Sequence, residues 1–427
     1  MLKTIALDAS AALASRVRWT HVAPTLLIVW IISMFDKSNM AIVMNDERFL
    51  HELGLRGQQV KLGWLSSGLF LAYAIFAPIW GWIVQRYGPR ITCALSLMVW
   101  ALACLWSAVA PDYDQLLWSR IALGLGEAAI YPVTLALVAN WFPLKERGRA
   151  TSFWWIGTMI GPMLVGVVVT ALIVATGWRG QFYSMAALAV VLPLPMLWLL
   201  VRDRPDQHLS ANPGEVELVK LGTLESNLDA PGATLKSSNS TWTYAPFWLT
   251  TLAIGSNAIF FWGWSIWLPT YLRVERGFSF STSGYLTFVI FGCAVVTILV
   301  TGHLSDRLFR RAPLAGLGWL LAGLLLIAAA LAPSPVSSVV LMTAALCSQQ
   351  VGIACGEMLM HSVVREAEMG STQGVRAFIT MLIGAMSPAL IGYLVQASGG
   401  FMGAFAVLAG AVLISGACML TLARKGF

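Results

Sequence analysis

The chain contains 427 residues, of which 58% are hydrophobic and 11% are charged, and its mean hydropathy is +0.75. Soluble domains carry about 25% charged residues, so this composition excludes a soluble globular protein and predicts one embedded in a lipid bilayer. The net charge of +7 follows from Lys and Arg residues that flank the apolar segments, and it does not indicate a nucleic-acid partner.

Apolar runs of roughly 20 residues, the length that a helix needs to cross a bilayer, occur about twelve times along the chain. The first six runs lie near residues 22–44, 62–84, 91–110, 115–140, 150–176 and 180–201, and the other six near residues 247–270, 283–306, 314–332, 338–362, 373–396 and 400–423. We therefore expect an all-α membrane protein with twelve transmembrane helices.

A hydrophilic stretch over residues 202–245 separates the runs into two groups of six. Because it is rich in Ser, Asn, Asp, Gly and Pro, it is typical of a flexible linker between a six-helix bundle at 1–201 and a second one at 246–427. Most of the 27 Lys and Arg residues lie on the same side of the membrane as this stretch, if the runs cross the membrane in alternating directions. The positive-inside rule then places the linker and both termini in the cytoplasm.

The loop after the second run (81–90) and the loop after the eighth run (302–311) share the frame Gly-x-x-x-polar-Arg. Two six-helix halves with a matching loop predict an internally duplicated transporter whose substrate site lies between the halves. We expect the charges in these loops to hold the halves together by pairing with acids and with carbonyls at helix C-termini. The residues concerned are Arg86, Arg90, Asp306 and Arg307.

Four charges lie inside the first and fourth runs, where each costs at least ~2.5–3.5 kcal/mol on insertion scales. Arg120 and Glu127 are seven residues apart, so they share one helix face, whereas Asp36 and Lys37 differ by ~100° in direction. A buried cation attracts a carboxylate substrate, which predicts substrate binding by Lys37 and Arg120. A carboxylate in a partly desolvated cavity can carry a proton, which predicts proton coupling by Asp36 and Glu127. The alternative is a structural ion pair of Arg120 with Glu127 or with Asp36.

Two further charges, Glu357 in the tenth run and Arg376 at the start of the eleventh, lie within apolar runs of the second half. They could form a structural pair. Alternatively, Arg376 binds a second anionic group of the substrate, or Glu357 binds an amine.

The twelve runs, the central loop and the repeated loop motif resemble the major facilitator superfamily over essentially the whole chain. Within it, the closer resemblance is to the anion:cation symporters, which include bacterial galactonate, hexuronate and tartrate transporters. The residues that carry it are Asp36-Lys37, Tyr73, ArgIleAlaLeuGlyLeuGlyGluAlaAlaIleTyrPro (120–132), TrpPheProLeuLysGluArgGlyArgAla (141–150) and TrpLeuProThrTyrLeu (267–272). The resemblance implies the major facilitator fold, proton-coupled symport of a small organic anion, and a substrate site that includes Tyr73. Lys37 replaces the family's usual Arg, which puts bidentate carboxylate binding at that position in doubt.

The fifth run contains GlyThrMetIleGlyProMetLeuValGly (157–166), which comes close to a motif of proton-coupled drug exporters. This favours an alternative function, the export of an amphipathic or aromatic compound in exchange for protons, although a kinked, closely packed helix explains the motif equally well. Thr158 stands where sugar-acid transporters tend to carry Gln. Trp264 belongs to a group of Trp residues that either form a membrane-interface belt or line the cavity and favour a flatter acid.

We therefore expect a proton-coupled symporter of a small carboxylate that works by alternating access, and not an enzyme. The expected partners are the organic anion, the proton and the lipid bilayer of a bacterial inner membrane, and the expected oligomeric state is a monomer. No cofactor beyond the coupling proton is expected. None of the six cysteines has metal-ligand spacing, so no metal site is expected either.

Overall fold

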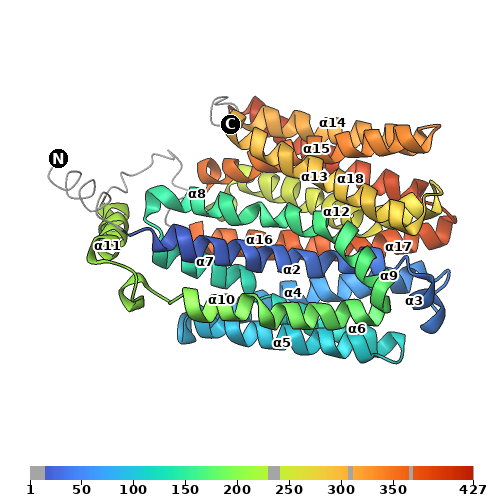
Figure 1. Cartoon of the computed structure of the whole chain (residues 1–427). Coiled ribbons are helices and arrows are strands. Elements are labelled where there is room, and N and C mark those ends of the chain that lie inside the picture. Colours follow the sequence, from blue (N-terminus) through green and yellow to red (C-terminus); the bar gives the residue numbers. More distant parts are fainter. Residues whose placement is uncertain (1–14, 229–240, 306–310, 365–368, 427) are drawn as a thin grey trace.

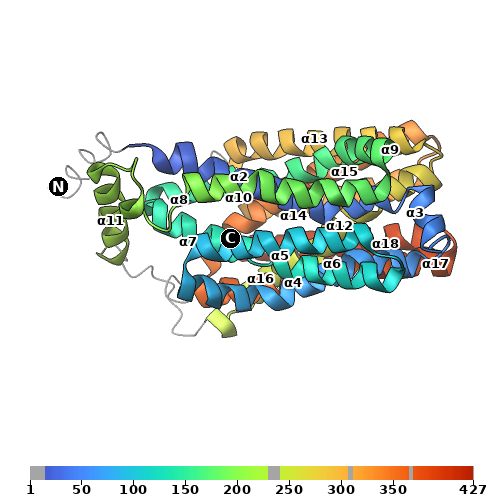
Figure 2. The ribbon, with the colours of Figure 1, turned by 60° about the horizontal axis from the view of Figure 1, so that its bottom comes forward.

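The computed structural model describes residues 15–228, 241–305, 311–364 and 369–426. Within these ranges the chain consists of helices and short connections, and most of the long helices run side by side along a common axis (Figure 1). The prediction of an all-α protein is confirmed. We name the two ends of the assembly after the short elements that lie there, the α3 end and the α11 end (Figure 2).

The first bundle packs α2 on α9, α4 on α6, and α5 on both α6 and α9. Its elements are η1 (Arg18–Val22), α2 (Ala23–Val43), α3 (Glu47–Glu52), α4 (Gln59–Tyr87), α5 (Pro89–Val109), α6 (Tyr113–Glu127), α7 (Ile130–Trp141), α8 (Leu144–Trp155), α9 (Gly157–Val191) and α10 (Pro193–Leu200). α9 is kinked at Gly177, whose φ of 78° is a conformation that favours glycine, and the chain reverses there.

The second bundle packs α14 on α15 and α18, and α12 on α16 and α18. Its elements are α12 (Ala245–Val274), α13 (Phe280–Ser305), α14 (Arg311–Leu331), α15 (Pro335–Val363), α16 (Met369–Ala385), α17 (Ser387–Ser398) and α18 (Met402–Arg424). The bundles meet through α9 against α13 and through α4 against α16 and α17. The first contact joins the fifth and eighth spans, and the second joins the eleventh and second spans. The two contacts are therefore equivalent between the two halves, as expected of an internal duplication.

Ten stretches of the described residues are long and apolar enough to cross a membrane. One of them, Leu144–Leu200, contains the reversal at Gly177 and so supplies two passes. α12 adds a further helix of 30 residues, about 45 Å long, which also suffices to cross. The structure is therefore consistent with the twelve predicted passes.

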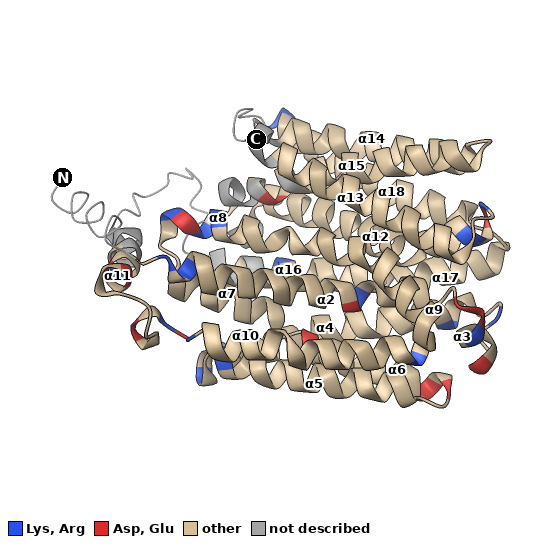
Figure 3. Cartoon of the chain, in the orientation of Figure 1, with Lys and Arg blue, Asp and Glu red and all other residues tan. Residues whose placement is uncertain are grey.

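The outer surface of the bundles is apolar along the length of the helices. Leu102 on α5 is 61% exposed and Leu324 on α14 is 59% exposed, and Figure 3 shows the charged residues gathered mainly at the two ends. Continuous exposed apolar surface of this extent is typical of contact with lipid. The chain is a multi-pass membrane protein.

The stretch 202–245, predicted as a flexible linker, contains two helical elements in its first part, η2 (Pro205–Gln207) and α11 (Pro213–Leu228). The start of α11 has a helix cap that the overall composition of the stretch does not reveal. The Asn212 side chain accepts a hydrogen bond from the Glu215 amide at 3.0 Å, and Pro213 occupies the first helical position. Part of the linker is thus a capped helix.

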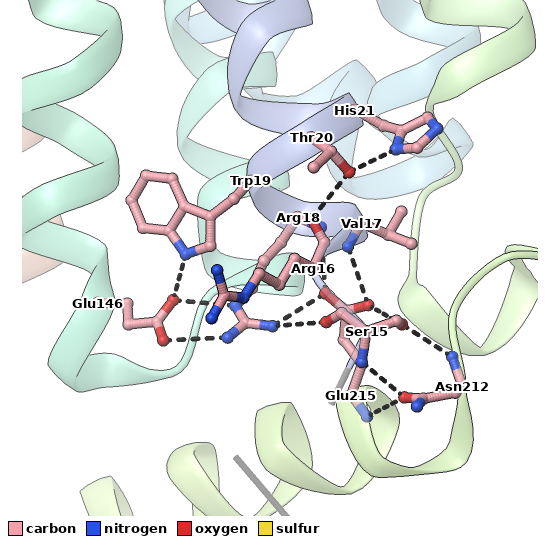
Figure 4. Close-up of polar contacts among 10 residues, drawn as sticks. All are labelled: Ser15, Arg16, Val17, Arg18, Trp19, Thr20, His21, Glu146, Asn212 and Glu215. Atoms are coloured by element: carbon pink, nitrogen blue, oxygen red, sulfur yellow. Dashed lines mark hydrogen bonds and ion pairs between the residues drawn. The ribbon is translucent and has the colours of Figure 1, made fainter. Parts of the chain in front are cut away.

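α11 is anchored by what we call the linker cluster, which consists of Ser15, Arg18, Glu146 and Glu215 (Figure 4). The Arg18 guanidinium donates to Glu146 at 2.9 and 3.1 Å and to Glu215 at 3.0 Å. Glu215 is fully buried and also accepts hydrogen bonds from the Ser15 hydroxyl and the Val17 amide. The cluster ties the linker to the start of the first bundle and to α8.

The two bundles close against each other toward the α3 end. Asn45 donates to Thr270 at 3.0 Å, and Arg273 donates to Glu47 at 2.7 Å. A β-carbon added to Gly166 would lie 2.2 Å from the carbonyl oxygen of Gly284, so only glycine permits this approach of α9 and α13. This end of the interface is tightly packed.

Candidate functional site

The middle of α2 carries two charged residues that point to different neighbours. Asp36 is fully buried and Lys37 is 1% exposed. The Asp36 carboxylate faces α5, where it accepts hydrogen bonds from the indole N–H of Trp100 and from the thiol of Cys104 at 3.2 Å. Lys37 faces α6 instead. The predicted divergence of these two side chains is confirmed.

Lys37 forms an ion pair with Glu127, the last residue of α6. The Lys37 ammonium also donates to the Ser33 hydroxyl at 2.6 Å and lies 4.7 Å from the centroid of the Tyr73 ring. Ser33 donates in turn to Glu127 at 3.2 Å. Tyr73, predicted as part of the site, is therefore in contact with its cation.

Arg120 does not pair with Glu127, although the two share a face of the same helix. Its guanidinium is fully buried, and its nearest partner is the backbone carbonyl of Asp36 at 3.5 Å, the outer limit for a hydrogen bond. Its Nε and Nη1 atoms have no hydrogen-bond partner among the described residues, and neither does Oε1 of Glu127. We call Asp36, Lys37, Arg120 and Glu127 the central cluster.

The central cluster thus combines buried charge with unused hydrogen-bonding capacity. Buried polar groups in folded proteins are nearly always hydrogen-bonded, and an unsatisfied buried group costs about 1–3 kcal/mol, more when it is charged. Free guanidinium N–H groups fit a carboxylate, and a carboxylate with one free oxygen can take up a proton. The arrangement is suited to binding an anion and moving a proton.

The second bundle contributes an ion pair between Arg376 on α16 and Glu357 on α15. It is bidentate, with distances of 3.0 and 2.9 Å. The Arg376 side chain is 9% exposed and that of Glu357 is 34% exposed. The pair itself fits the first of the sequence-based alternatives.

The structure places two other predicted site residues in local packing. The Thr158 hydroxyl donates to the carbonyl of Trp155 at 2.7 Å, within its own stretch of helix. Trp264 stacks on Phe260 with ring centroids 5.8 Å apart and contacts Phe405 edge-on, inside the second bundle. Neither residue has a described contact with the central cluster, and their role in substrate binding stays a prediction.

Of the four predicted gating residues, two are described. Arg90 donates from its side chain to the carbonyl of Trp198 at 2.6 Å and from its backbone to Asp203 at 2.8 Å. It therefore meets the predicted types of partner, an acid and a helix C-terminus, but within the first bundle and its linker. Arg86 is exposed and lies over the ring of its neighbour Tyr87. Asp306 and Arg307 lie outside the described residues.

The site also contains residues that sequence reasoning missed. Ser33 stands four residues before Lys37, on the same helix face, so helical spacing alone could have found it. Tyr131 stands four residues after Glu127 and lies close enough to Glu357 and Arg376 for their charges to act on its hydroxyl. Nothing in the sequence around Trp100 indicates its role, because its partner Asp36 lies on another helix.

No group of three His, Cys, Asp or Glu side chains suited to a metal ion occurs in the part of the chain that the structure describes.

Comparison with known proteins agrees with this architecture. The sequence model of the Major Facilitator Superfamily matches residues 26–386. The "Probable L-galactonate transporter" of Escherichia coli (strain K12) is 25% identical over 95% of this chain and 89% of its own length. The "Hexuronate transporter" of Bacillus subtilis (strain 168) is 24% identical over 93% of each chain. A bacterial homologue of the human lysosomal transporter Spinster, crystallised in an inward-facing and occupied conformation, shares the fold with a TM-score of 0.73 at 18% identity, over 95% of this chain and 97% of its own.

Proposed function

Because the chain belongs to the Major Facilitator Superfamily of membrane transporters, we propose that it carries a small organic carboxylate across the membrane together with a proton. The relatives named above are transporters of sugar acids, which supports an organic anion as the substrate class. The observation that carries the proposal is the central cluster, where a Lys–Glu ion pair lies beside a buried guanidinium with free donors.

The charge balance of the central cluster explains why proton and anion travel together. When all four side chains are ionised, two carboxylates balance two cations. Protonation of Glu127 leaves one excess positive charge and releases Lys37, and an incoming carboxylate restores neutrality. An uncompensated charge in a low-dielectric interior costs several kcal/mol, so the half-loaded states are disfavoured while the bundles move.

The residues divide the work by position. Lys37 and Arg120 supply the donors for the substrate carboxylate, with Tyr73 packed against the Lys37 ammonium. Glu127 exchanges the proton, because it contacts the cation that the substrate needs. The Asp36 carboxylate lies on a different face of α2, held by Trp100 and Cys104, and acts as the counter-charge that keeps Arg120 buried.

The contacts at the α3 end support an alternating-access cycle in which this end is closed while substrate exchanges at the α11 end. Asn45, Thr270, Glu47 and Arg273 would then have to separate when the α3 end opens. We further propose a bacterial inner membrane location, with the α11 end and both termini in the cytoplasm, as the Lys and Arg distribution predicts.

Uptake into proteoliposomes tests this function. The purified chain is reconstituted, a pH gradient with an acidic exterior is imposed, and accumulation of labelled galactonate and labelled glucuronate is followed. We expect accumulation above the external concentration that collapses when a protonophore is added. Uptake that ignores the pH gradient would contradict proton coupling. Proton-driven movement of an amphipathic dye in the opposite direction, without uptake of either acid, would support the antiport alternative instead.

A further inference from the structure

The ion pair of Arg376 and Glu357 is unusual in how unequally its members are buried. The cation is 9% exposed and its carboxylate partner is 34% exposed. Both guanidinium N–H groups that face Glu357 are used, at 3.0 and 2.9 Å, in the geometry that a guanidinium offers to any carboxylate. An internal carboxylate with access to water can be replaced on such a guanidinium by an external one.

The pair also faces the other bundle. Arg376 lies on α16, which packs against α4 of the first bundle. Tyr131, at the start of α7, lies close enough to Arg376 and Glu357 for their charges to act on its hydroxyl, and it lies just beyond the break that follows Glu127. The ion pair of the second bundle therefore lies close to a residue of the first bundle that follows Glu127 by four positions.

We propose that Arg376 binds a second anionic group of the substrate in exchange for Glu357, so that the preferred substrates are dianions with acidic groups at both ends. The proposal rests on the proposed function, because the first carboxylate must dock on Lys37 and Arg120. Glu357 then acts as a built-in occupant. It neutralises Arg376 in the empty site and turns toward its exposed side when the distal acid arrives.

A pair of acids that differ by one carboxylate, D-gluconate and D-glucarate, serves as the probe. Competition of each unlabelled acid against the proton-driven uptake of labelled galactonate is measured in proteoliposomes carrying the whole chain. We expect the wild-type protein to prefer the dianion by roughly tenfold or more, as for a charge-assisted bidentate contact. Glu357→Gln should strengthen this preference, because the internal competitor is gone.

Removing the cation separates recognition from stability. Arg376→Gln alone leaves Glu357 without its partner and can unfold, so the decisive variant is the neutral double change Arg376→Gln with Glu357→Gln. We expect it to fold, to transport the monoanion with normal proton dependence, and to have lost the dianion preference. Glu52→Gln with Arg179→Gln, which neutralises an ion pair within the first bundle, is the matched control and should keep the preference.

The outcomes are separable. Failure of the wild-type protein to take up either acid under a pH gradient overturns both this inference and the proposed function. Proton-driven uptake with no dianion preference, or a preference that survives in the double variant, overturns this inference alone. A preference for an amino-substituted monoacid that Glu357→Gln abolishes also overturns it, because Glu357 rather than Arg376 would then be the recognition group.

Discussion

The linker cluster and the central cluster, both within the described residues, differ in how completely their hydrogen bonds are satisfied. In the linker cluster, Arg18 donates from its Nε, Nη1 and Nη2 atoms, and Glu215 accepts from a hydroxyl, backbone amides and the guanidinium. In the central cluster, Arg120 has one contact at 3.5 Å, and the Nε and Nη1 atoms of Arg120 and one oxygen of Glu127 have no partner among the described residues.

This difference separates structural charge from functional charge. A saturated cluster resists any change, since removing one member leaves the others desolvated and unpaired. An unsaturated cluster is less stable than it could be, and a ligand or a proton can complete it. We therefore expect the linker cluster to govern stability and the central cluster to govern transport.

The largest expected effect comes from one substitution made in each cluster. Glu127 and Glu215 are both fully buried and both bonded to a cation and a serine. Glu127→Gln should abolish proton-driven accumulation but keep counterflow exchange, because the amide preserves shape and cannot carry the proton. Glu215→Gln should keep coupled transport and lower the melting temperature. Gradient-driven uptake by Glu127→Gln at the wild-type level would remove Glu127 from the mechanism.

Truncation of the unsatisfied arginine should act on binding. Arg120→Ala removes a buried donor to the substrate carboxylate, and such losses are roughly 2–5 kcal/mol, or a factor of about 30 or more in affinity. Binding of galactonate to the purified variant, measured by calorimetry, checks this.

Lys37 offers a graded control, since Lys37→Arg keeps the charge and should be tolerated better than Lys37→Ala. Unchanged affinity in Arg120→Ala would mean that this residue is structural. It would also contradict the assignment of substrate binding to the unsatisfied groups of the central cluster.

Removal of a member of the linker cluster should act on stability and on the docking of α11. Glu215→Ala leaves Arg18 with Glu146 and the Ser15 carbonyl as its described partners, so we expect a loss near the lower end of the roughly 3–5 kcal/mol seen for broken buried pairs. The change should lower the melting temperature and speed proteolysis within the linker.

Glu217 is exposed on the same helix and provides the matched substitution. Glu217→Ala should leave both measurements unchanged. Equal proteolysis of the two variants would show that the cluster does not hold α11.

The smallest expected effect concerns the ion pair of Glu47 and Arg273, which is accessible to solvent and so extends the comparison from buried to exposed charges. Burial alone would raise the pKa of Glu47, but the hydrogen bond and charge of Arg273, followed by those of Arg56, lower it overall. A carboxyl whose pKa is lowered by a contact stabilises that contact above its ordinary pKa, and the stabilisation is lost as the pH falls through the lowered value. Closure of the α3 end should therefore weaken slightly at acidic pH.

Spin-label distances across the α3 end, followed as a function of pH, measure this. Exposed pairs contribute about 0.2–1 kcal/mol, so the closed population should change by a factor of a few at most. Glu47→Gln should remove the pH dependence of closure. Glu52→Gln is the control, because Glu52 pairs with Arg179 inside the first bundle and its pKa is lowered without joining the two bundles. Equal effects of both substitutions would show that closure of the α3 end does not depend on the Glu47–Arg273 contact.

The sequence by itself determined the features that depend on local chemistry. Apolar length and the position of the charges predicted the membrane-spanning helices, the division into two halves and the midspan residues of the central cluster. Helical periodicity predicted correctly that Asp36 and Lys37 face different neighbours. Apolar length, charge position and helical periodicity are properties of a single helix, so they can be derived from the sequence without knowing how the helices pack.

Only the tertiary structure decided which charges meet. Periodicity placed Arg120 beside Glu127, yet Glu127 pairs with Lys37, because α6 ends at Glu127 next to α2 and brings its carboxylate to the ammonium. The same holds for Trp100 on Asp36 and for Glu215 on Arg18, whose partners come from other elements. A contact between helices depends on their crossing angle and separation, and on the packing of every side chain between them, and these quantities have no local signal in the sequence.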